Sequence, residues 1–283
     1  SLSNYFKKNK ISYVIHLAAQ AGVRYSISNP DEYFENNVFG FYNILKISKK
    51  FNIKHLAYAS TSSVYGMSKE FPLSENMNTD KPQSFYAATK KTNEIMAYSF
   101  SSIYKIPTSG LRFFTVYGPY GRPDMFIHKL LNALKKNKRI NIHNKGKNLR
   151  DFTYIDDVVK ILTNFSLIKN KIKILNIARS KPIKNINLIY EIKKILRIKK
   201  ENFNFKNHTK DLKNYFDNKQ KINSKILQKQ IIAVLENLEL NLEIEKDKEI
   251  LFLITNYLKS IGQINKSYEL IERYEINSDK NFN

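Results

Sequence analysis

Ile11-Ser12-Tyr13-Val14-Ile15-His16-Leu17-Ala18-Ala19 is a short apolar run with β-branched residues, a composition typical of a buried strand. Asn29-Pro30-Asp31 follows it and supplies a helix cap together with a proline suited to the first helical turn. Apolar residues then recur at helical spacing between Phe34 and Ile47. This region therefore predicts a strand, a loop and a helix.

The same order of elements repeats along the next part of the chain. His55 to Ala59 predicts a second strand, and a helix is expected from Ser84 to about Tyr104, before the helix breaker Pro107. Thr108 to Val116 predicts a third strand. Strands that alternate with helices of this length favour an α/β fold with a doubly wound parallel sheet.

Ligands of such sheets bind where the strands end at their carboxyl edge. The segments that follow the three predicted strands should therefore line one crevice: Ala18 to Arg24, Ser60 to Tyr65 and Thr115 to Arg122.

Beyond Pro123 the predicted elements become shorter. They are a helix near Phe126 to Lys136, a strand at Ile140 to His143, a helix from Asp156, a strand at Ile172 to Ala178 and a helix at Asn187 to Leu196. From Glu201 onward the chain has helical periodicity and little turn chemistry, which predicts a mostly helical tail.

Composition excludes several classes of protein. The chain has 283 residues and no cysteine, which excludes disulfides and thiolate zinc sites, and we expect no metal centre. The formal charge of +23 is spread along the whole chain, so it favours anionic ligands and makes a nucleic-acid partner a distant alternative. No apolar run is long enough for a membrane span or a signal peptide, so we expect a cytoplasmic protein without a membrane partner.

Tyr86 and Lys90 lie four residues apart on a predicted helix and therefore share one face, with Cβ atoms about 5 to 6 Å apart. A nearby ammonium favours the phenolate, and lowering a tyrosine pKa from near 10 to neutrality requires roughly 4 kcal/mol. The same spacing begins at Tyr42, Tyr65, Tyr190 and Tyr215, so the spacing alone is weak evidence. Tyr86 differs because the preceding strand ends in the hydroxyl cluster Ser60-Thr61-Ser62-Ser63.

These stretches together resemble the extended short-chain dehydrogenase/reductase family and, within it, the UDP-glucuronate 4-epimerases. The similarity covers roughly Asn4 to Pro182. The motifs that carry it are His16-Leu17-Ala18-Ala19-Gln20-Ala21-Gly22-Val23-Arg24, Tyr58-Ala59-Ser60-Thr61-Ser62-Ser63-Val64-Tyr65-Gly66, Tyr86-Ala87-Ala88-Thr89-Lys90-Lys91, the segment from Leu111 to Met125, and Asp151-Phe152-Thr153-Tyr154-Ile155-Asp156-Asp157-Val158.

The resemblance implies a Rossmann-like fold that binds NAD, and a reaction at C4 of a nucleotide sugar through a 4-keto intermediate. Tyr86 would take the proton of the 4-hydroxyl, Lys90 would bind the nicotinamide ribose, and Thr61 would share the proton. Ala18, Ala19 and Gln20 would line the cofactor. The substrate contacts implied are Ser62 and Ser63 with the sugar, Thr115 and Arg122 with the uronate carboxylate, and Arg150 with the phosphates.

The resemblance also implies a domain division and a partner. We expect an incomplete NAD-binding Rossmann-like domain at 1–119, a smaller α/β substrate region with the last Rossmann elements at 120–200, and the divergent helical tail at 201–283. A homodimer would form through helices around Phe34 to Ser48 and Ser84 to Tyr104.

The chain departs from the family pattern in two places. It has no Gly-x-x-Gly-x-x-Gly turn, which in the family holds the cofactor pyrophosphate, and it has no clear uridine-binding segment after Lys200. The strand at Ile11 to Ala19 is then expected at an exposed sheet edge, and this chain alone is expected to bind NAD poorly and to turn over little or no substrate.

Three readings of the function follow. The first is UDP-glucuronate to UDP-galacturonate epimerisation. The second is a non-catalytic remnant that acts as an interaction protein, and the third is another nucleotide-sugar epimerase or dehydratase. Related 4,6-dehydratases carry an Asp-Glu pair where Ser62 and Ser63 stand, which argues against dehydration.

Overall fold

The structure is a computed structural model that describes residues 2–136, 138–164, 173–196, 198 and 203–206. The described residues fall into two compact units. The first contains the residues up to Val116 together with Asn148–Ile183, and the second contains Tyr117–Lys147 and residues 184–206.

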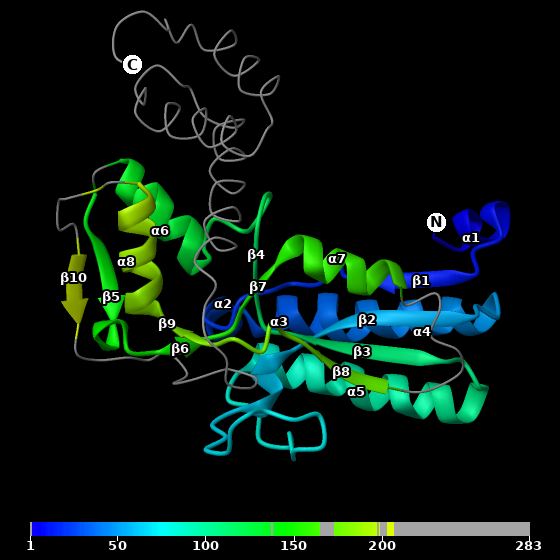
Figure 1. The fold of residues 1–283 in the computed structure, drawn as a ribbon. Helices are drawn as coiled ribbons and strands as arrows, with labels where there is room; N and C mark the ends of the chain where they lie inside the picture. The colour runs from blue at the N-terminus through cyan, green and yellow to red at the C-terminus, as the bar shows by residue number, and fades with distance from the viewer. Residues whose placement is uncertain (1, 137, 165–172, 197, 199–202, 207–283) are drawn as a thin grey trace, which may run out of the picture. The chain divides into compact units, whose positions relative to one another are not determined.

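The first unit is built on a four-stranded parallel sheet with the order β1-β2-β3-β8. Its strands are β1 (Tyr13–His16), β2 (His55–Thr61), β3 (Thr108–Phe113) and β8 (Lys173–Ile177). Their parallel course is visible in Figure 1. The predicted Rossmann-like parallel sheet is therefore confirmed.

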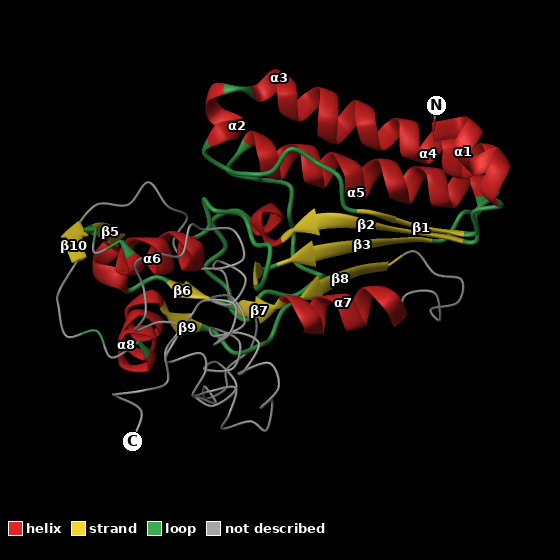
Figure 2. Ribbon diagram, turned by 90° about the horizontal axis from the view of Figure 1, so that it is seen from above, coloured by secondary structure: helices red, strands yellow, loops and turns green. Residues whose placement is uncertain are grey.

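Helices cover both faces of this sheet. Helices α4 (Gly40–Lys50) and α5 (Phe85–Tyr104) lie on one face, and α7 (Ile155–Asn164) lies on the other, as Figure 2 shows. The remaining helical segments of the unit are α1 (Leu2–Asn9), α2 (Tyr25–Ser28), α3 (Pro30–Tyr33), the π-helix η1 (Phe34–Phe39) and the 3₁₀-helix η2 (Ser62–Tyr65). Pro30 stands in the first turn of α3, as its fixed φ favours.

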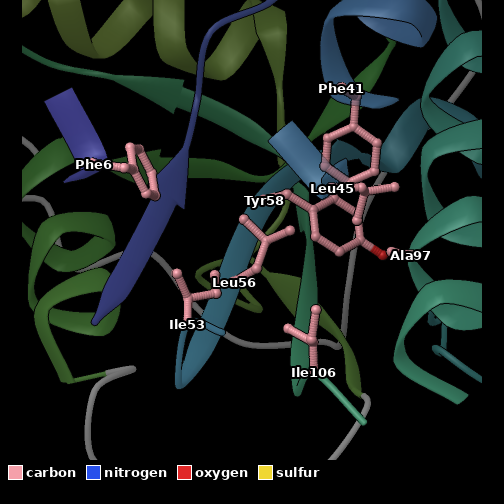
Figure 3. Close-up of a cluster of buried hydrophobic side chains, with 8 residues drawn as sticks. All are labelled: Phe6, Phe41, Leu45, Ile53, Leu56, Tyr58, Ala97 and Ile106. Atoms are coloured by element: carbon pink, nitrogen blue, oxygen red, sulfur yellow. The ribbon is translucent and has the colours of Figure 1, made fainter. Parts of the chain in front are cut away.

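The core of the first unit follows the alternation of side chains along β2. Leu56 and Tyr58 point toward α4 and α5, where they pack with Phe41, Leu45 and other buried side chains (Figure 3). Ala57 faces the opposite side and packs with side chains of α7. Fully burying a leucine or phenylalanine side chain contributes about 1.5–3 kcal/mol, so both layers stabilise the sheet.

Strand β1 forms an edge of the sheet among the described residues, as the sequence predicted. Val14 packs against the buried cluster that includes side chains of α4. About half of the surface is exposed for Tyr13, Ile15 and, after the strand, Leu17, at 46%, 47% and 50%. The apolar face that the sequence placed at an exposed edge is therefore present in the structure.

The second unit is a smaller α/β assembly. It contains α6 (Phe126–Lys135), β5 (Ile140–His143), η3 (Asn144–Gly146), α8 (Asn185–Ile195) and β10 (Phe203–Lys206), with β5 and β10 paired in parallel. Two short strand pairs lie where the chain passes between the units: β4 (Thr115–Tyr117) with β7 (Phe152–Tyr154), and β6 (Leu149–Arg150) with β9 (Ile183–Lys184). The predicted helical tail lies outside the described residues, except that residues 203–206 form β10 and not a helix.

Two predicted elements differ in detail. The strand expected at Thr108 to Val116 is divided, because the amide of Phe114 still bonds to Ile177 but the amide of Thr115 turns to the carbonyl of Asp151. The helix expected between Phe34 and Ile47 begins as a π-helix. No helix in the described ranges combines the length and apolarity of a membrane span.

Candidate active site

Helix α5 carries Tyr86 and Lys90 in its first two turns. Ser84 starts the helix, because its hydroxyl accepts a hydrogen bond of 3.1 Å from the amide of Ala87. The ring of Tyr86 meets the ring of Tyr33 edge-on, with centroids 6.0 Å apart. The Ser84 cap fixes the start of α5, and the ring of Tyr33 packs against the ring of Tyr86.

Lys90 is a buried ammonium beside the carboxyl end of β2. Its side chain is 2% exposed, and its Nζ donates a hydrogen bond of 3.0 Å to the carbonyl of Ala59. Burial lowers the pKa of Lys90 from 10.5 to about 8. A desolvated cation interacts more strongly with a nearby phenolate than a hydrated one does, because the local dielectric is lower.

Thr61, Ser62 and Ser63 lie where β2 ends. The hydroxyl of Thr61 caps η2 by accepting the amide of Ser63 at 3.2 Å. Thr61 and Ser62 are buried, and Ser63 is half-buried. Since the hydroxyl oxygen of Thr61 accepts this bond, its proton is available for donation to another group.

Ala18, Ala19 and Gln20 follow β1 at the same edge of the sheet, because β1 and β2 are parallel. Gln20 is held by Asn37, a residue that the sequence analysis missed. Asn37 accepts the amide of Gln20 at 2.7 Å, donates to its carbonyl at 3.0 Å, and lies 3.1 Å from the hydroxyl of Thr89 on α5. Asn37 therefore ties the segment after β1 to the helix that carries Lys90.

A signal for Asn37 was present in the sequence. Tyr33, Asn37 and Phe41 are spaced by four residues on one helical face, and all three are buried. A polar residue within such a buried stripe requires hydrogen-bonding partners, which makes it a candidate for a structural or functional role.

Tyr33 supports the loop that follows Gln20. Its hydroxyl lies 3.0 Å from the carbonyl oxygen of Ala21 and 2.6 Å from that of Gly22. The same ring supports Tyr86, so the loop after β1 and the start of α5 share one buried side chain.

His16 stands at the end of β1 and stacks on Phe41, with ring centroids 5.5 Å apart. Burial and the charge of Lys90 lower the pKa of His16 from 6.5 to about 4. At neutral pH the imidazole of His16 is therefore uncharged, and of His16 and Lys90 only Lys90 carries a positive charge.

Thr115 and Arg150 also belong to the first unit. The amide of Thr115 donates to the carbonyl of Asp151 at 3.1 Å, which places Thr115 at the carboxyl edge beyond β3. Arg150 is half-buried and donates to the carbonyl of Leu149 at 2.8 Å. Their roles as substrate contacts stay predictions.

Arg122 belongs to the second unit, whereas the other expected site residues belong to the first. Its guanidinium forms a two-point ion pair with Asp124, with Nε–Oδ1 and Nη2–Oδ2 distances of 2.9 and 2.6 Å. This pairing lowers the pKa of Asp124. The fork that was expected to bind a substrate carboxylate therefore already holds a carboxylate of the chain.

The described residues fit the ribose end of a dinucleotide. Lys90 can donate three hydrogen bonds, and among the described residues only Ala59 receives one, so donors remain for the hydroxyls of a ribose. Ala18 and Ala19 are small and allow a ring to approach the backbone. In the described part of the chain, no group of three or more His, Asp or Glu side chains could hold a metal ion.

A parallel α/β sheet with a tyrosine, a lysine and a threonine at its carboxyl edge defines the class of short-chain dehydrogenase-like proteins. Residues 1–178 match the NAD dependent epimerase/dehydratase family. The chain belongs to this family.

Individual relatives agree with this assignment. Protein CapI of Staphylococcus aureus is 52% identical over 162 residues, which are 57% of this chain and 48% of that protein. A probable UDP-glucuronate 4-epimerase of Rhizobium meliloti is 50% identical over 153 residues, 54% of this chain and 45% of that protein. The chain thus spans about half the length of these curated relatives.

A solved structure gives the same likeness. UDP-glucuronic acid 4-epimerase from Bacillus cereus, in complex with UDP-glucuronic acid and NAD, superimposes with a TM-score of 0.76 and 29% identity. The match covers 86% of this chain and 79% of that protein.

Proposed function

We propose that the chain acts in the NAD-dependent epimerisation of a nucleotide sugar at C4, with UDP-glucuronate and UDP-galacturonate as the substrate pair. The observation that carries the proposal is the buried ammonium of Lys90, one helical turn after Tyr86 and bonded to β2 two residues before Thr61. This arrangement supplies a proton acceptor, a cation that stabilises the phenolate, and a hydroxyl that can share the proton.

The chemistry of the chain's own residues is proton transfer. Tyr86 accepts the proton of the 4-hydroxyl as the 4-keto sugar forms, and it returns the proton after the ketone has presented its other face. Lys90 stabilises the phenolate and binds the nicotinamide ribose, while Thr61 donates to the same sugar oxygen. Bound NAD supplies the acceptor and then the donor of the C4 hydride.

The substrate class is supported by the relatives and by the residues after Thr61. The Rhizobium meliloti and Bacillus cereus relatives are named for UDP-glucuronate. Ser62 and Ser63 offer no acid and base for elimination of water, which favours epimerisation over dehydration. Thr115, Arg122 and Arg150 remain the proposed contacts for the carboxylate and phosphates, and Arg122 must exchange Asp124 for the substrate carboxylate to serve in this role.

We also propose that two copies of the chain associate through η1, α4 and α5. This surface, which we call the α4–α5 face, exposes Phe39, Tyr42, Ile95 and Tyr98 at 51%, 38%, 59% and 64%. A cluster of large exposed apolar side chains on adjacent helices is typical of an association surface.

The test of the function is turnover by the purified chain. The chain is incubated with UDP-glucuronate and with NAD at a concentration high enough to saturate weak binding, and the sugar C4 configuration is followed by proton NMR. Formation of the galacturonate product supports the proposal. Binding of both ligands without any product contradicts it and favours the second reading, a non-catalytic interaction protein.

A further inference from the structure

A buried ion pair lies on the same helix as Tyr86 and Lys90. Glu94 follows Lys90 by one turn of α5, and Arg112 reaches it from β3. Both contacts of the fork are 2.9 Å long, from Nε to Oε1 and from Nη2 to Oε2. The two side chains are 5% and 3% exposed, so this charged pair is almost fully removed from water.

The carboxylate of Glu94 also holds the residue before Thr61. The hydroxyl of Ser60 donates to Oε1 of Glu94 at 2.6 Å. One turn earlier, Lys90 holds the carbonyl of Ala59. Side chains from two successive turns of α5 therefore hydrogen-bond to Ala59 and Ser60, the two residues of β2 that precede Thr61.

Arg112 holds the segment after Thr61. Its Nη1 donates to the hydroxyl of Tyr65 at 3.0 Å, and Tyr65 in turn donates to Oδ1 of Asn176 on β8 at 2.6 Å. Tyr65 ends η2, the 3₁₀-helix that Thr61 caps. The ion pair thus contacts the chain on both sides of Thr61, through Ser60 and through Tyr65.

A buried ion pair contributes little net stability compared with apolar residues of the same volume, because both ions lose their hydration. The planar guanidinium fork instead imposes one geometry on its carboxylate partner. We propose that Glu94 and Arg112 are the positioning pair of this site, which sets the position of Thr61 relative to Tyr86 and Lys90. The proposal rests on the function proposed above.

The test uses Arg112→Lys, which keeps a cation beside Glu94 but cannot form the two-point contact and reach Tyr65 together. We expect kcat to fall about tenfold or more while KM for the nucleotide sugar changes less than about threefold, because misplaced reacting groups slow the chemical step. A second readout is the titration of Lys90, measured by competitive acetylation and mass spectrometry. We expect its pKa to rise from about 8 toward 10.5 as water reaches the ammonium.

Two titratable side chains lie on the elements around Lys90. His16 on β1 interacts with it, and Glu94 lies one turn further along α5. Arg112→Lys leaves both in place, so a change reports the geometry and not the loss of a charge. This readout needs no turnover, and it separates the two proposals: an inactive parent chain refutes the proposed function, whereas the positioning role is still tested by Lys90.

The matched control is His55→Leu combined with Ser109→Ala. It removes the buried contact of 3.0 Å between His55 Nε2 on β2 and Ser109 Oγ on β3, at the amino end of these two strands. We expect this control to leave the titration of Lys90 and kcat unchanged. A control that alters both as strongly as Arg112→Lys does would show a general structural effect and overturn the proposal.

A third variant covers the case in which Arg112→Lys does not fold. Glu94→Leu with Arg112→Met replaces the pair by apolar side chains and should restore the folded state. The replaced pair carries no net charge, and Ser60 and Tyr65 lose their hydrogen bonds to it on either side of Thr61. We therefore expect a native circular dichroism spectrum with a raised Lys90 pKa, because water reaches the ammonium. A folded variant of either kind with the parent's Lys90 titration, and with the parent's kcat where the chain is active, contradicts the positioning role.

Discussion

The Nζ atom of Lys90 lies 3.0 Å from the carbonyl oxygen of Ala59. Together with the hydrogen bond from Ser60 to Glu94, this contact joins α5 to β2 directly before Thr61. Tyr86 lies one turn earlier on the same helix, so its distance from the hydroxyls after β2 depends on this attachment.

Tyr86→Phe removes only the ionisable hydroxyl of the proposed proton acceptor. We expect kcat for epimerisation to fall by roughly 100-fold or more, with little change in the affinity for the nucleotide sugar. Turnover by NMR and binding by calorimetry measure the two quantities. Tyr104→Phe, at the far end of the same helix, is the control and should retain activity. Equal turnover of the Tyr86→Phe variant and the parent would exclude this role.

Asn37→Ala removes the two hydrogen bonds that the Asn37 side chain forms with the backbone of Gln20. We expect the free energy of unfolding to fall by about 1–3 kcal/mol, because the amide and carbonyl of Gln20 lose their partner in a half-buried position. Urea unfolding measures the loss. Asn36→Ala is the control, since Asn36 is exposed and, within the described ranges, its side chain bonds only to the carbonyl of Glu32. A similar loss of stability in both variants would mean that the hydrogen bonds between Asn37 and Gln20 make no specific contribution.

His16 should make stability depend on pH below neutrality. Its pKa is about 4 in the folded chain and 6.5 ordinarily, so the unfolded chain binds more protons between these values. Stability is therefore lost as pH falls through this window, by about 3 kcal/mol at most. His16→Asn should flatten this part of the pH profile of unfolding. An identical profile for the variant and the parent would refute the burial of a neutral imidazole.

Gly66 and Gly40 should respond to alanine in opposite directions. At Gly66, φ is +59° and an added Cβ would lie 2.6 Å from the carbonyl oxygen of Lys81, so Gly66→Ala should lower stability by about 1–3 kcal/mol. At Gly40 the nearest atom lies at 3.5 Å in a helix, so Gly40→Ala should raise stability by up to about 1 kcal/mol. Thermal unfolding compares them, and equal signs would contradict the described backbone.

The α4–α5 face should control association. We expect the chain to sediment as a dimer, and Tyr98→Glu to weaken the dimer by about tenfold or more, because a carboxylate is costly to bury. Analytical ultracentrifugation over a range of concentrations measures this. Tyr190→Glu on α8, where the side chain is 59% exposed, is the control. Dissociation by the control alone would place the interface elsewhere.

Much of the first unit could be predicted from its sequence because each strand and helix has its own periodicity. Helix α5 was predicted within one residue, and in the second unit the strand at Ile140–His143 was predicted with the observed bounds. Strand β2 runs on through Ser60 and Thr61, which the pattern placed after the strand. The reason is tertiary: Glu94 satisfies the hydroxyl of Ser60, so a polar residue can continue a buried strand.

The site was predictable where neighbouring residues define it and hidden where distant ones do. Tyr86 and Lys90 share a helix face, so their spacing predicts their proximity. Arg112 and Glu94 come from different elements, and neither residue carries a local sign of the other. Arg122 and Asp124 are only two residues apart. Their spacing could not show whether the Arg122 guanidinium pairs with Asp124 or with a substrate carboxylate.

The π-helix η1 has a consequence for insertions and deletions in this region. A π-helical turn accommodates one residue more than an α-helical turn. Deleting one residue from this turn would therefore let the segment relax to an ordinary α-helix while α3 and α4 keep their rotation relative to each other. Deleting or inserting a residue within α4 would instead rotate the two sides of the helix by about 100° relative to each other. A change in length is therefore better tolerated at η1 than within α4.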